Sequence, residues 1–348
     1  MFVALVMTWY VTDGKTRKEI AETLSLPKGV NDSDLLDAVQ LSLNDLQTNG
    51  RVNISSANRM YLFGNFAYSK RLSDDLQKSL HIGVSQFNKT VPPEKARMKV
   101  NNWVADKTGG VLTDLLPPGI IDQDTRLALI TASYFTGSWK EKFERSQTKD
   151  ADFFLLKGGT NKVSMMFRED SFSICAMDRL DAKVLKLPFA DDRWNLYIIL
   201  PKGKSDLPKL LQRYAKNVGL SGIISCDFRE KSIGLYLPRL VLGAATHVNA
   251  TKIIQSLGII DMFAKKANFS SLTGSPNVTA SGVIHQSAMK VGEQGGAAPA
   301  SHAHVKFSEP QPDIPVFRVD HPFMLMVVYN GTIPVFVGHY VGPESNSN

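Results

Sequence analysis

From residue 127 onward the chain is dominated by short apolar segments with the composition of β-strands. Residues 127–135 form a nearly continuous apolar run that includes Tyr and Phe, which is typical of a strand buried on both faces. Asn330-Gly331 lies between two further apolar runs and is a strong signal for a β-hairpin. The other strand candidates are 163–167, 172–176, 182–187, 196–200, 233–237, 323–329 and 332–337. This pattern predicts large sheets.

The first 125 residues are predicted to be mainly helical. The helix candidates in this part are 33–46, 71–80 and 94–116. Two more, 207–216 and 245–257, lie further along the chain. The first candidate follows the capping sequence Asn31-Asp32-Ser33, and the third is ended by Pro117-Pro118-Gly119. No repeat or low-complexity linker divides the chain. We therefore expect a single α+β domain over residues 1–348, mainly helical over 1–125 and mainly sheet over 126–348.

Residues 1–11 are mostly apolar and resemble the core of a signal peptide, but they lack a basic lead and a small-residue cleavage site. We expect them to form a buried helix instead. A buried helix that begins at residue 1 suggests that upstream sequence has been lost or trimmed. No run reaches the roughly 20 apolar residues of a membrane-spanning helix, so no transmembrane segment is predicted.

The formal net charge is +7, but the basic residues are scattered and are not interleaved with aromatic residues. Nucleic-acid binding is therefore not expected. The two cysteines, Cys175 and Cys226, are far apart in the sequence. We expect them to be buried small hydrophobes rather than a disulfide.

Sequence signatures of catalysis are absent. The chain has no Gly-x-Ser-x-Gly elbow, His-Glu-x-x-His motif, Walker loop or Gly-x-Gly-x-x-Gly turn. His302 and His304 would share a face of an extended strand, but two ligands without a third are a weak metal signal. We therefore predict no enzyme activity, no cofactor and no metal site.

Residues 292–315 differ in composition from the rest of the chain. Small residues, Gly295-Gly296 and Ala297-Ala298, precede spaced prolines at 310, 312 and 315. This composition predicts a long, exposed, extended loop, which is either functional or a flexible linker.

Motifs along nearly the whole chain resemble those of the serpin family. Residues 131–143, TASYFTGSWKEKF, are similar to the serpin pattern NAxYFxGxWxxxF. Further matches, in family order, are Asn102-Trp103-Val104, Thr108, Asp114-Leu115-Leu116, Asp124-Thr125-Arg126-Leu127, Leu187-Pro188-Phe189, Ile199-Leu200-Pro201, Leu237-Pro238-Arg239, Leu257-Gly258-Ile259, Met262-Phe263 and Phe317-Arg318-Val319-Asp320-His321-Pro322-Phe323-Met324-Leu325. Each motif alone is weak, and together they are specific.

The resemblance implies an α+β serpin fold with three β-sheets, a helical subdomain and an exposed reactive-centre loop at about 293–316. It implies a monomeric inhibitor of a trypsin- or chymotrypsin-like serine protease. The protease cleaves the loop, forms an acyl-enzyme, and is trapped when the cut loop inserts as a new strand into the central sheet. The family's first helix and strand are not matched here. The alternative is a serpin-fold protein that traps no protease and serves as a carrier, a chaperone or a protease substrate.

The matched hinge of this loop is Glu293-Gln294-Gly295-Gly296-Ala297-Ala298-Pro299-Ala300-Ser301, against a family pattern near EEGTEAAAA. Its small residues suit a strand that must be wedged into a packed sheet. Pro299 does not, because it has no N–H for a neighbouring strand. His302, His304 and Lys306 would also give an inserted strand one polar face. These departures favour the non-inhibitory alternative.

Counting from the hinge places the reactive bond at Glu309–Pro310. A proline after the scissile bond makes a poor protease substrate. Cleavage at Phe307–Ser308 by a chymotrypsin-like protease, or at Lys306–Phe307 by a trypsin-like protease, is therefore predicted on a par with cleavage at Glu309–Pro310.

The resemblance also assigns roles to residues outside the loop. Glu293 and Arg239 match a pair that bridges the top of the central sheet, and Trp139 matches the tryptophan beside it. Thr131 stands where the family usually has an Asn that bonds to the histidine matched by His285. Whether that hydrogen bond is kept is left open by the sequence.

Seven Asn-x-Ser/Thr sequons, at Asn31, Asn53, Asn88, Asn249, Asn268, Asn277 and Asn330, favour a secreted or cell-surface glycoprotein, with a cytoplasmic protein as the alternative.

Overall fold

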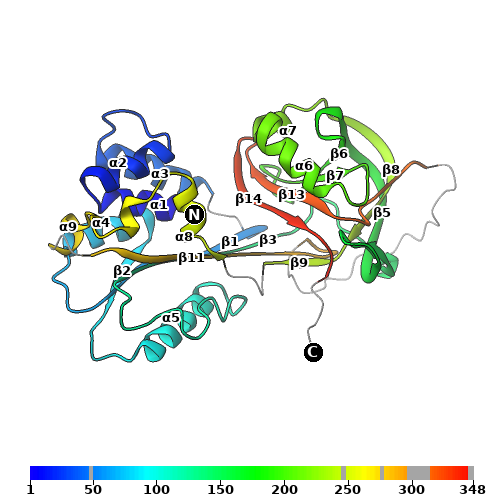
Figure 1. The fold of residues 1–348 in the computed structure, drawn as a ribbon. Helices are drawn as coiled ribbons and strands as arrows, with labels where there is room; N and C mark the ends of the chain where they lie inside the picture. Colours follow the sequence, from blue (N-terminus) through cyan, green and yellow to red (C-terminus); the bar gives the residue numbers. More distant parts are fainter. Residues whose placement is uncertain (47–49, 244–247, 275–277, 296–313, 344–348) are drawn as a thin grey trace. The chain divides into compact units, whose positions relative to one another are not determined.

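The computed structural model describes residues 1–46, 50–243, 248–274, 278–295 and 314–343 (Figure 1). The chain forms two compact units, which are described separately. Unit 1 comprises Met1–Gln47, Ile54–Tyr134 and Gly243–Ala288, and unit 2 comprises Thr48–Asn53, Phe135–Leu242 and Met289–Asn348. The single domain expected over residues 1–348 stays a prediction.

Unit 1 holds most of the helices. They are α1 (Phe2–Tyr10), α2 (Gly14–Thr23), α3 (Asp32–Asp45), α4 (Lys70–Leu80), α5 (Pro93–Lys107), α8 (Thr251–Ser256), η4 (Asp261–Phe263) and α9 (Ser270–Thr273). The apolar segment at the start of the chain is a buried helix, as predicted, because Ala4 to Tyr10 of α1 are all buried. The side chain of Asn31 accepts a hydrogen bond from the N–H of Asp34 at the start of α3, which confirms the predicted cap.

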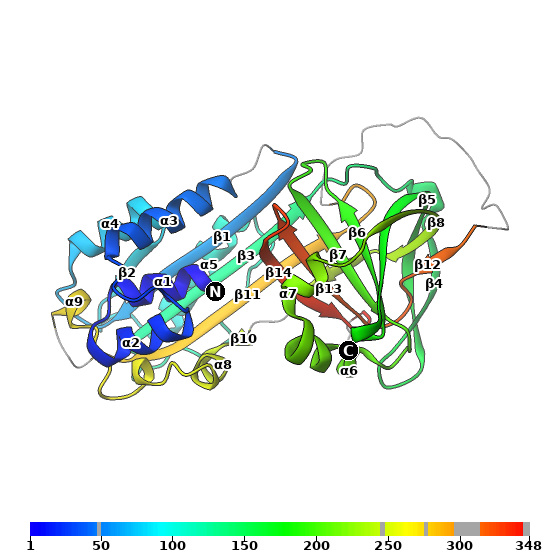
Figure 2. The same cartoon turned by 90° about the horizontal axis from the view of Figure 1, so that it is seen from above.

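The first sheet has the strand order β10–β11–β3–β1–β2, with β9 also paired to β11. Figure 2 shows β1, β3 and β11 running alongside one another. The bounds are β1 (Val52–Phe63), β2 (Gly83–Phe87), β3 (Leu127–Gly137), β9 (Leu240–Leu242), β10 (Val248–Asn249) and β11 (Ala280–Val291). The predicted strand at 127–135 is confirmed as β3.

The strands of unit 1 contribute to two different cores. Leu127 and Leu129 of β3 belong to the core formed with α1 to α4, while Ala128 and Ile130 belong to the core formed with α5. Alternate side chains of a strand point to opposite faces. Helices therefore cover both faces of these strands in unit 1, with α1 to α4 on one side and α5 on the other (Figure 1). This explains why β3 is apolar at successive positions.

Unit 2 is dominated by strands in the order β12–β8–β5–β6–β7–β13–β14, with β4 paired to β5. Their bounds are β4 (Lys149–Phe154), β5 (Thr160–Met177), β6 (Ala182–Pro188), β7 (Trp194–Pro201), β8 (Arg229–Pro238), β12 (Val316–Arg318), β13 (Phe323–Tyr329) and β14 (Ile333–Tyr340). The long strand β5 pairs with β4 over Thr160–Met165, with β8 over Met165–Ile174 and with β6 over Ser173–Met177. Three sheets were predicted, but hydrogen bonding divides the described strands into two sheets, because β5 joins β4, β8 and β6 into one of them.

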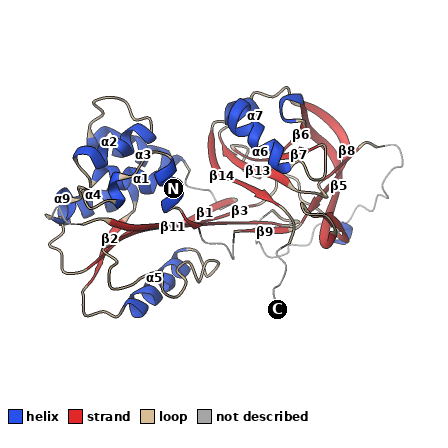
Figure 3. Ribbon diagram, in the orientation of Figure 1, coloured by secondary structure: helices blue, strands red, loops and turns tan. Residues whose placement is uncertain are grey.

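The hairpin predicted at Asn330-Gly331 is confirmed. It joins β13 to β14, and both of its residues have positive φ angles, 46° and 67°. Short helical segments, η1 (Arg145–Gln147), η2 (Asp178–Leu180), α6 (Leu207–Arg213), the π-helical turn η3 (Tyr214–Val218) and α7 (Gly219–Ile224), complete unit 2. Leu207, Leu210 and Ile223 from α6 and α7 pack on β6, β7 and β13 (Figure 3).

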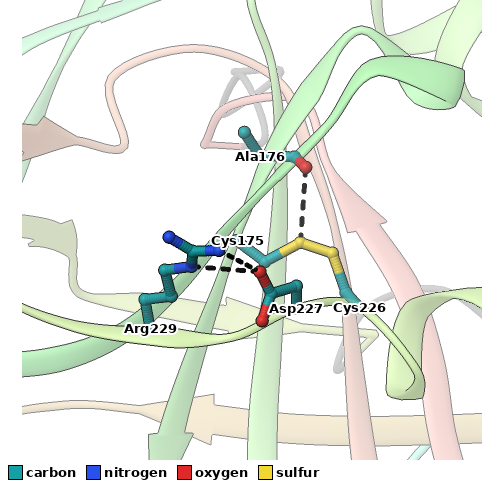
Figure 4. The surroundings of a disulfide bond; sticks show 5 residues. All are labelled: Cys175, Ala176, Cys226, Asp227 and Arg229. Carbon is teal, nitrogen blue, oxygen red and sulfur yellow. Dashed lines mark hydrogen bonds and ion pairs between the residues drawn. A yellow bond between two sulfur atoms is a disulfide. The ribbon is translucent and has the colours of Figure 1, made fainter.

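The prediction for the cysteines was wrong. Cys175 in β5 and Cys226 after α7 form a disulfide, with their Cα atoms 6.2 Å apart (Figure 4). Sequence separation says little about proximity, because the chain returns to β5 along β8 after α7. Asp227, which follows Cys226, pairs with Arg229 at 2.7 Å beside the disulfide.

Two other expectations also differ from the structure. The helix expected over 94–116 ends at Lys107, because Gly109 and Gly110 adopt φ angles of 62° and 77° that no α-helix contains. The strands expected at 163–167 and 172–176 are one strand, β5, whose charged residues 168–170 stay in register with β8.

Among the helices of the described residues, none has both the length and the apolar composition that a membrane span requires.

Candidate functional site

A tight turn, the hinge turn, follows β11 and comprises residues 292–295. Gly292 and Gly295 exchange two backbone hydrogen bonds, each 2.9 Å long, and leave Glu293 and Gln294 at the tip. The hinge turn reverses the chain directly after Val291, the last residue of β11. Residues 293–295 of the predicted hinge thus lie in this turn.

The hinge turn is held by donors from residues 139–143. The N–H of Trp139 donates to the carbonyl of Gln294 at 3.0 Å, and the N–H of Phe143 donates to that of Glu293 at 2.9 Å. The indole Nε1 of Trp139 donates to the carbonyl of Gly292 at 2.8 Å. The buried Trp139 ring stacks on Phe189, with centroids 4.7 Å apart. Trp139 thus combines core packing with a specific hold on the hinge turn.

Gly295 lies where no side chain fits. Its φ angle is 101°, and an added Cβ would lie 1.9 Å from the carbonyl oxygen of Gly137 and 2.7 Å from the backbone nitrogen of Trp139. Both obstacles are backbone atoms, which cannot move aside as a flexible side chain can. The close approach of the hinge turn to β3 therefore requires glycine at 295.

Glu293 is buried and bound on two sides. Its Oε1 accepts hydrogen bonds from Thr148 Oγ1, at 2.9 Å, and from the Arg239 guanidinium, which also forms an ion pair with it. Burial opposes ionisation of Glu293, but the hydrogen bonds from Arg239, from the backbone and from Thr148 hold its pKa below the usual value. Glu293 is therefore a carboxylate at neutral pH, and the resemblance-based pairing of Glu293 with Arg239 is present in the structure.

A separate polar chain lies in unit 1, where β3 and β11 are neighbours. Thr131 Oγ1 is 3.1 Å from His285 Nδ1, and His285 Nε2 is 2.9 Å from Ser287 Oγ. Ser287 Oγ is in turn 2.9 Å from Ser133 Oγ. Thr131 therefore keeps a hydrogen bond to His285, although its side chain is shorter than the usual Asn.

His285 titrates in an unusual range. Burial is the main cause that lowers its pKa from 6.5 to about 4. The imidazole is neutral at pH 7, so that one ring nitrogen donates and the other accepts. Neutral His285 can thus connect the hydroxyls of Thr131 and Ser287 within one polar chain.

The remaining predicted site residues lie outside the described residues. They are Gly296, Ala297, Ala298, Pro299 and Ala300 of the hinge, Lys306, Phe307, Ser308, Glu309 and Pro310 around the reactive bond, and the pair His302 and His304. Among the residues that are described, no group of three His, Cys, Asp or Glu side chains could hold a metal ion.

Some residues of these clusters were not singled out from the sequence. Ser133 and Ser287 each stand two positions after a predicted residue, so the period of a strand could have pointed to them. Thr148 had no such signal, because it reaches Glu293 from a segment 145 residues away.

Comparison with known proteins identifies the family. The sequence profile of a family described as serpin (serine protease inhibitor) matches residues 1–343. The chain belongs to the serpin family. This serpin is 29% identical to Serpin B6 of Pongo abelii in an alignment that covers 99% of this chain and 91% of that protein. It is 31% identical to leukocyte elastase inhibitor A of Mus musculus in an alignment that covers 82% of this chain and 77% of that protein.

Solved serpin structures share the fold. The structure of Serpin48 from the insect Tenebrio molitor has a TM-score of 0.86 at 23% identity, covering 98% of this chain and 89% of that one. Uncleaved ovalbumin has a TM-score of 0.84 at 23% identity, covering 98% of this chain and 91% of that one. The predicted serpin fold is therefore confirmed. The family description, serine protease inhibitor, agrees with the predicted function at that general level.

Proposed function

We propose that this serpin inhibits a trypsin- or chymotrypsin-like serine protease, as a monomer, by offering residues 293–316 as bait. The hinge turn carries this proposal. It starts the loop at the end of β11, and backbone donors from 139–143 together with Arg239 hold it in place. The relatives named as inhibitors, such as leukocyte elastase inhibitor A, support the same activity.

The cut loop would insert between β3 and β11. These strands are direct neighbours in the first sheet, so no strand occupies that position now. In unit 1 their separation would break the polar chain of Thr131, His285, Ser287 and Ser133. The inserted strand would restore backbone hydrogen bonds on both of its sides, which favours insertion once cleavage frees the loop. We propose that residues 1–348 act as one domain in this step.

Three bonds remain candidates for cleavage, namely Glu309–Pro310, Phe307–Ser308 and Lys306–Phe307. The test is incubation with trypsin, chymotrypsin and a glutamate-specific protease, followed by denaturing gels and mass analysis of the released C-terminal peptide. We expect a gel-stable complex with the mass of serpin plus protease, and the peptide mass identifies the bond. Complete cleavage by all three proteases without any such complex would contradict inhibition.

Pro299 favours the second candidate function, a serpin-fold carrier, chaperone or substrate. A proline in the inserted segment removes one backbone donor. The two functions differ in the melting temperature after cleavage. Loop insertion adds a strand and raises the melting temperature sharply, whereas a plain substrate melts as before.

We also propose that the protein is a secreted or cell-surface glycoprotein. Disulfides persist in oxidising compartments, and Cys175 and Cys226 form one. Of the described sequon asparagines, Asn31, Asn53, Asn88, Asn249 and Asn330 are exposed and Asn268 is partly exposed. Removal of N-glycans from protein recovered from the medium of expressing cells should lower its apparent mass. Intracellular, unglycosylated protein with two free thiols would support the cytoplasmic alternative.

A further inference from the structure

Unit 1 contains a cavity of about 600 Å³ that the inhibitory function does not use. It lies where β1 and β2 end, between residues 88–93, which lead into α5, and residues 121–126, which lead into β3. Its volume falls within the range of small-molecule sites, about 300–1,000 Å³.

The apolar part of the cavity is aromatic. Phe63 at the end of β1 and Phe87 at the end of β2 both line it and stack on each other, with ring centroids 5.5 Å apart and an interplanar angle of 29°. Phe87 also stacks on Tyr61 at 5.6 Å, which holds its ring in place. Both phenylalanines keep part of their surface exposed. A planar aromatic ring could cover that surface by offset stacking.

The polar part of the cavity carries unbalanced positive charge. Lys89 and Arg126 line it, and in the described part of the chain neither forms an ion pair with a carboxylate. Arg126 is held by donation to the carbonyl of Gln123 at 2.8 Å. The one carboxylate of the lining, Asp122, already accepts hydrogen bonds from the hydroxyl and N–H of Thr125, both at 2.8 Å. Two cations and one carboxylate thus line the cavity, so its lining carries a net positive charge.

We propose that this cavity binds an aromatic carboxylate, with its ring on Phe63 and Phe87 and its carboxylate between Lys89 and Arg126. A carboxylate would satisfy both cations, and Arg126 offers planar donors that suit it. The site is independent of the reactive-centre loop, so neither proposal depends on the other.

The test is calorimetric titration of the intact protein with 2-naphthoate, and with 2-naphthylmethanol as the uncharged counterpart. For a ligand of this size we expect a Kd of about 1 mM or tighter. We expect the Kd of the alcohol to be at least about threefold higher, because the alcohol lacks one solvent-accessible charge pair and such a pair contributes about this much to binding. Decanoate, which has the charge but no ring, should also bind more weakly than 2-naphthoate.

Lys89→Gln is the decisive variant, since Lys89 is exposed and the change leaves the Asn88 sequon intact. It should weaken 2-naphthoate binding about three- to fivefold and leave the binding of the alcohol unchanged. Lys95→Gln, an exposed lysine outside the cavity, is the matched control and should have no effect. Absence of 2-naphthoate binding at 5 mM, equal effects of the two lysine variants, or tighter binding of decanoate would each overturn the proposal.

Discussion

Gly295 lies against the backbone of Gly137 so closely that a Cβ at position 295 would be 1.9 Å from the Gly137 carbonyl oxygen. A Cβ at Gly292, at the other end of the hinge turn, would have no atom within 4 Å apart from those of its neighbours in the chain. Two glycines of one turn thus tolerate a methyl group very differently.

Gly295→Ala should destabilise the protein by about 2–4 kcal/mol, because it combines a strained φ angle with a backbone clash. Gly292→Ala should cost less than about 1 kcal/mol. Thermal unfolding of the two variants beside the parent measures the difference. Equal melting temperatures for the two variants would contradict the close packing of Gly295 against the backbone of Gly137.

Glu293→Ala and Arg239→Ala should each destabilise the protein by about 1–3 kcal/mol, since each leaves a partly buried charge without its partner. The double variant should cost clearly less than the two single changes together. Denaturant unfolding of the four proteins gives the coupling free energy. The pair Lys140 and Asp192, with side chains 51% and 75% exposed, is the matched control and should show no measurable coupling. Additive effects at Glu293 and Arg239 would refute the ion pair.

Stability should fall as the pH is lowered from about 6.5 to 4 because of His285. Its folded-state pKa is lowered to about 4, so in this window the unfolded chain binds more protons than the folded protein. The loss attributable to His285 is at most about 3 kcal/mol. Melting temperatures of the parent and of His285→Gln across this window test it, with His339→Gln, at an exposed position, as the control. If His285→Gln keeps the full pH dependence of the parent, the cause lies elsewhere.

Reduction of the disulfide should lower the stability by about 4 kcal/mol, the chain-entropy value for a closed loop of 51 residues. The double variant Cys175→Ala/Cys226→Ala should melt at the temperature of the reduced parent and should not respond to reductant. Thiol titration of the denatured, unreduced protein checks the premise. Two titratable thiols in secreted protein would show that the bond does not form.

Pro299→Ala should lower the number of serpin molecules consumed per protease inhibited. Insertion competes with hydrolysis of the acyl-enzyme, and alanine restores a backbone donor worth about 0.5–1.5 kcal/mol in the inserted strand. The measurement is a titration of residual protease activity against serpin concentration. An unchanged stoichiometry would mean that position 299 does not need its donor.

Local sequence signals predicted the parts of the fold that have regular patterns. The cap at Asn31, the hairpin at Asn330-Gly331 and the buried strand β3 were all predicted from local residues, because turn chemistry and uniform apolarity act within a few positions. β1 was missed, since the polar pairs Ser55-Ser56 and Asn58-Arg59 interrupt its apolar pattern. β11 was missed because His285, Gln286 and Ser287 interrupt its apolar pattern.

Residues of the hinge-turn site could be predicted only where they match a position of a family motif. Glu293, Arg239 and Trp139 were found in that way, and the structure brings all three to the hinge turn. Thr148 could not be found, because its contact with Glu293 depends on how distant segments fold. The disulfide was missed for the same reason.

The strand order of unit 2 has a consequence for how the protein is made. β13 lies between β7 and β14, and its Met324, Met326 and Val328 complete the core beneath α6 and α7. Because ribosomes add about 5–20 residues per second, the roughly 120 residues between Pro201 and Phe323 delay the arrival of β13 by about 6–24 s. During that time a nascent chain presents the open edge of β7 and an unfinished apolar surface. Newly synthesised molecules are therefore most exposed to aggregation, and most dependent on chaperones, until β13 has been made and has paired with β7.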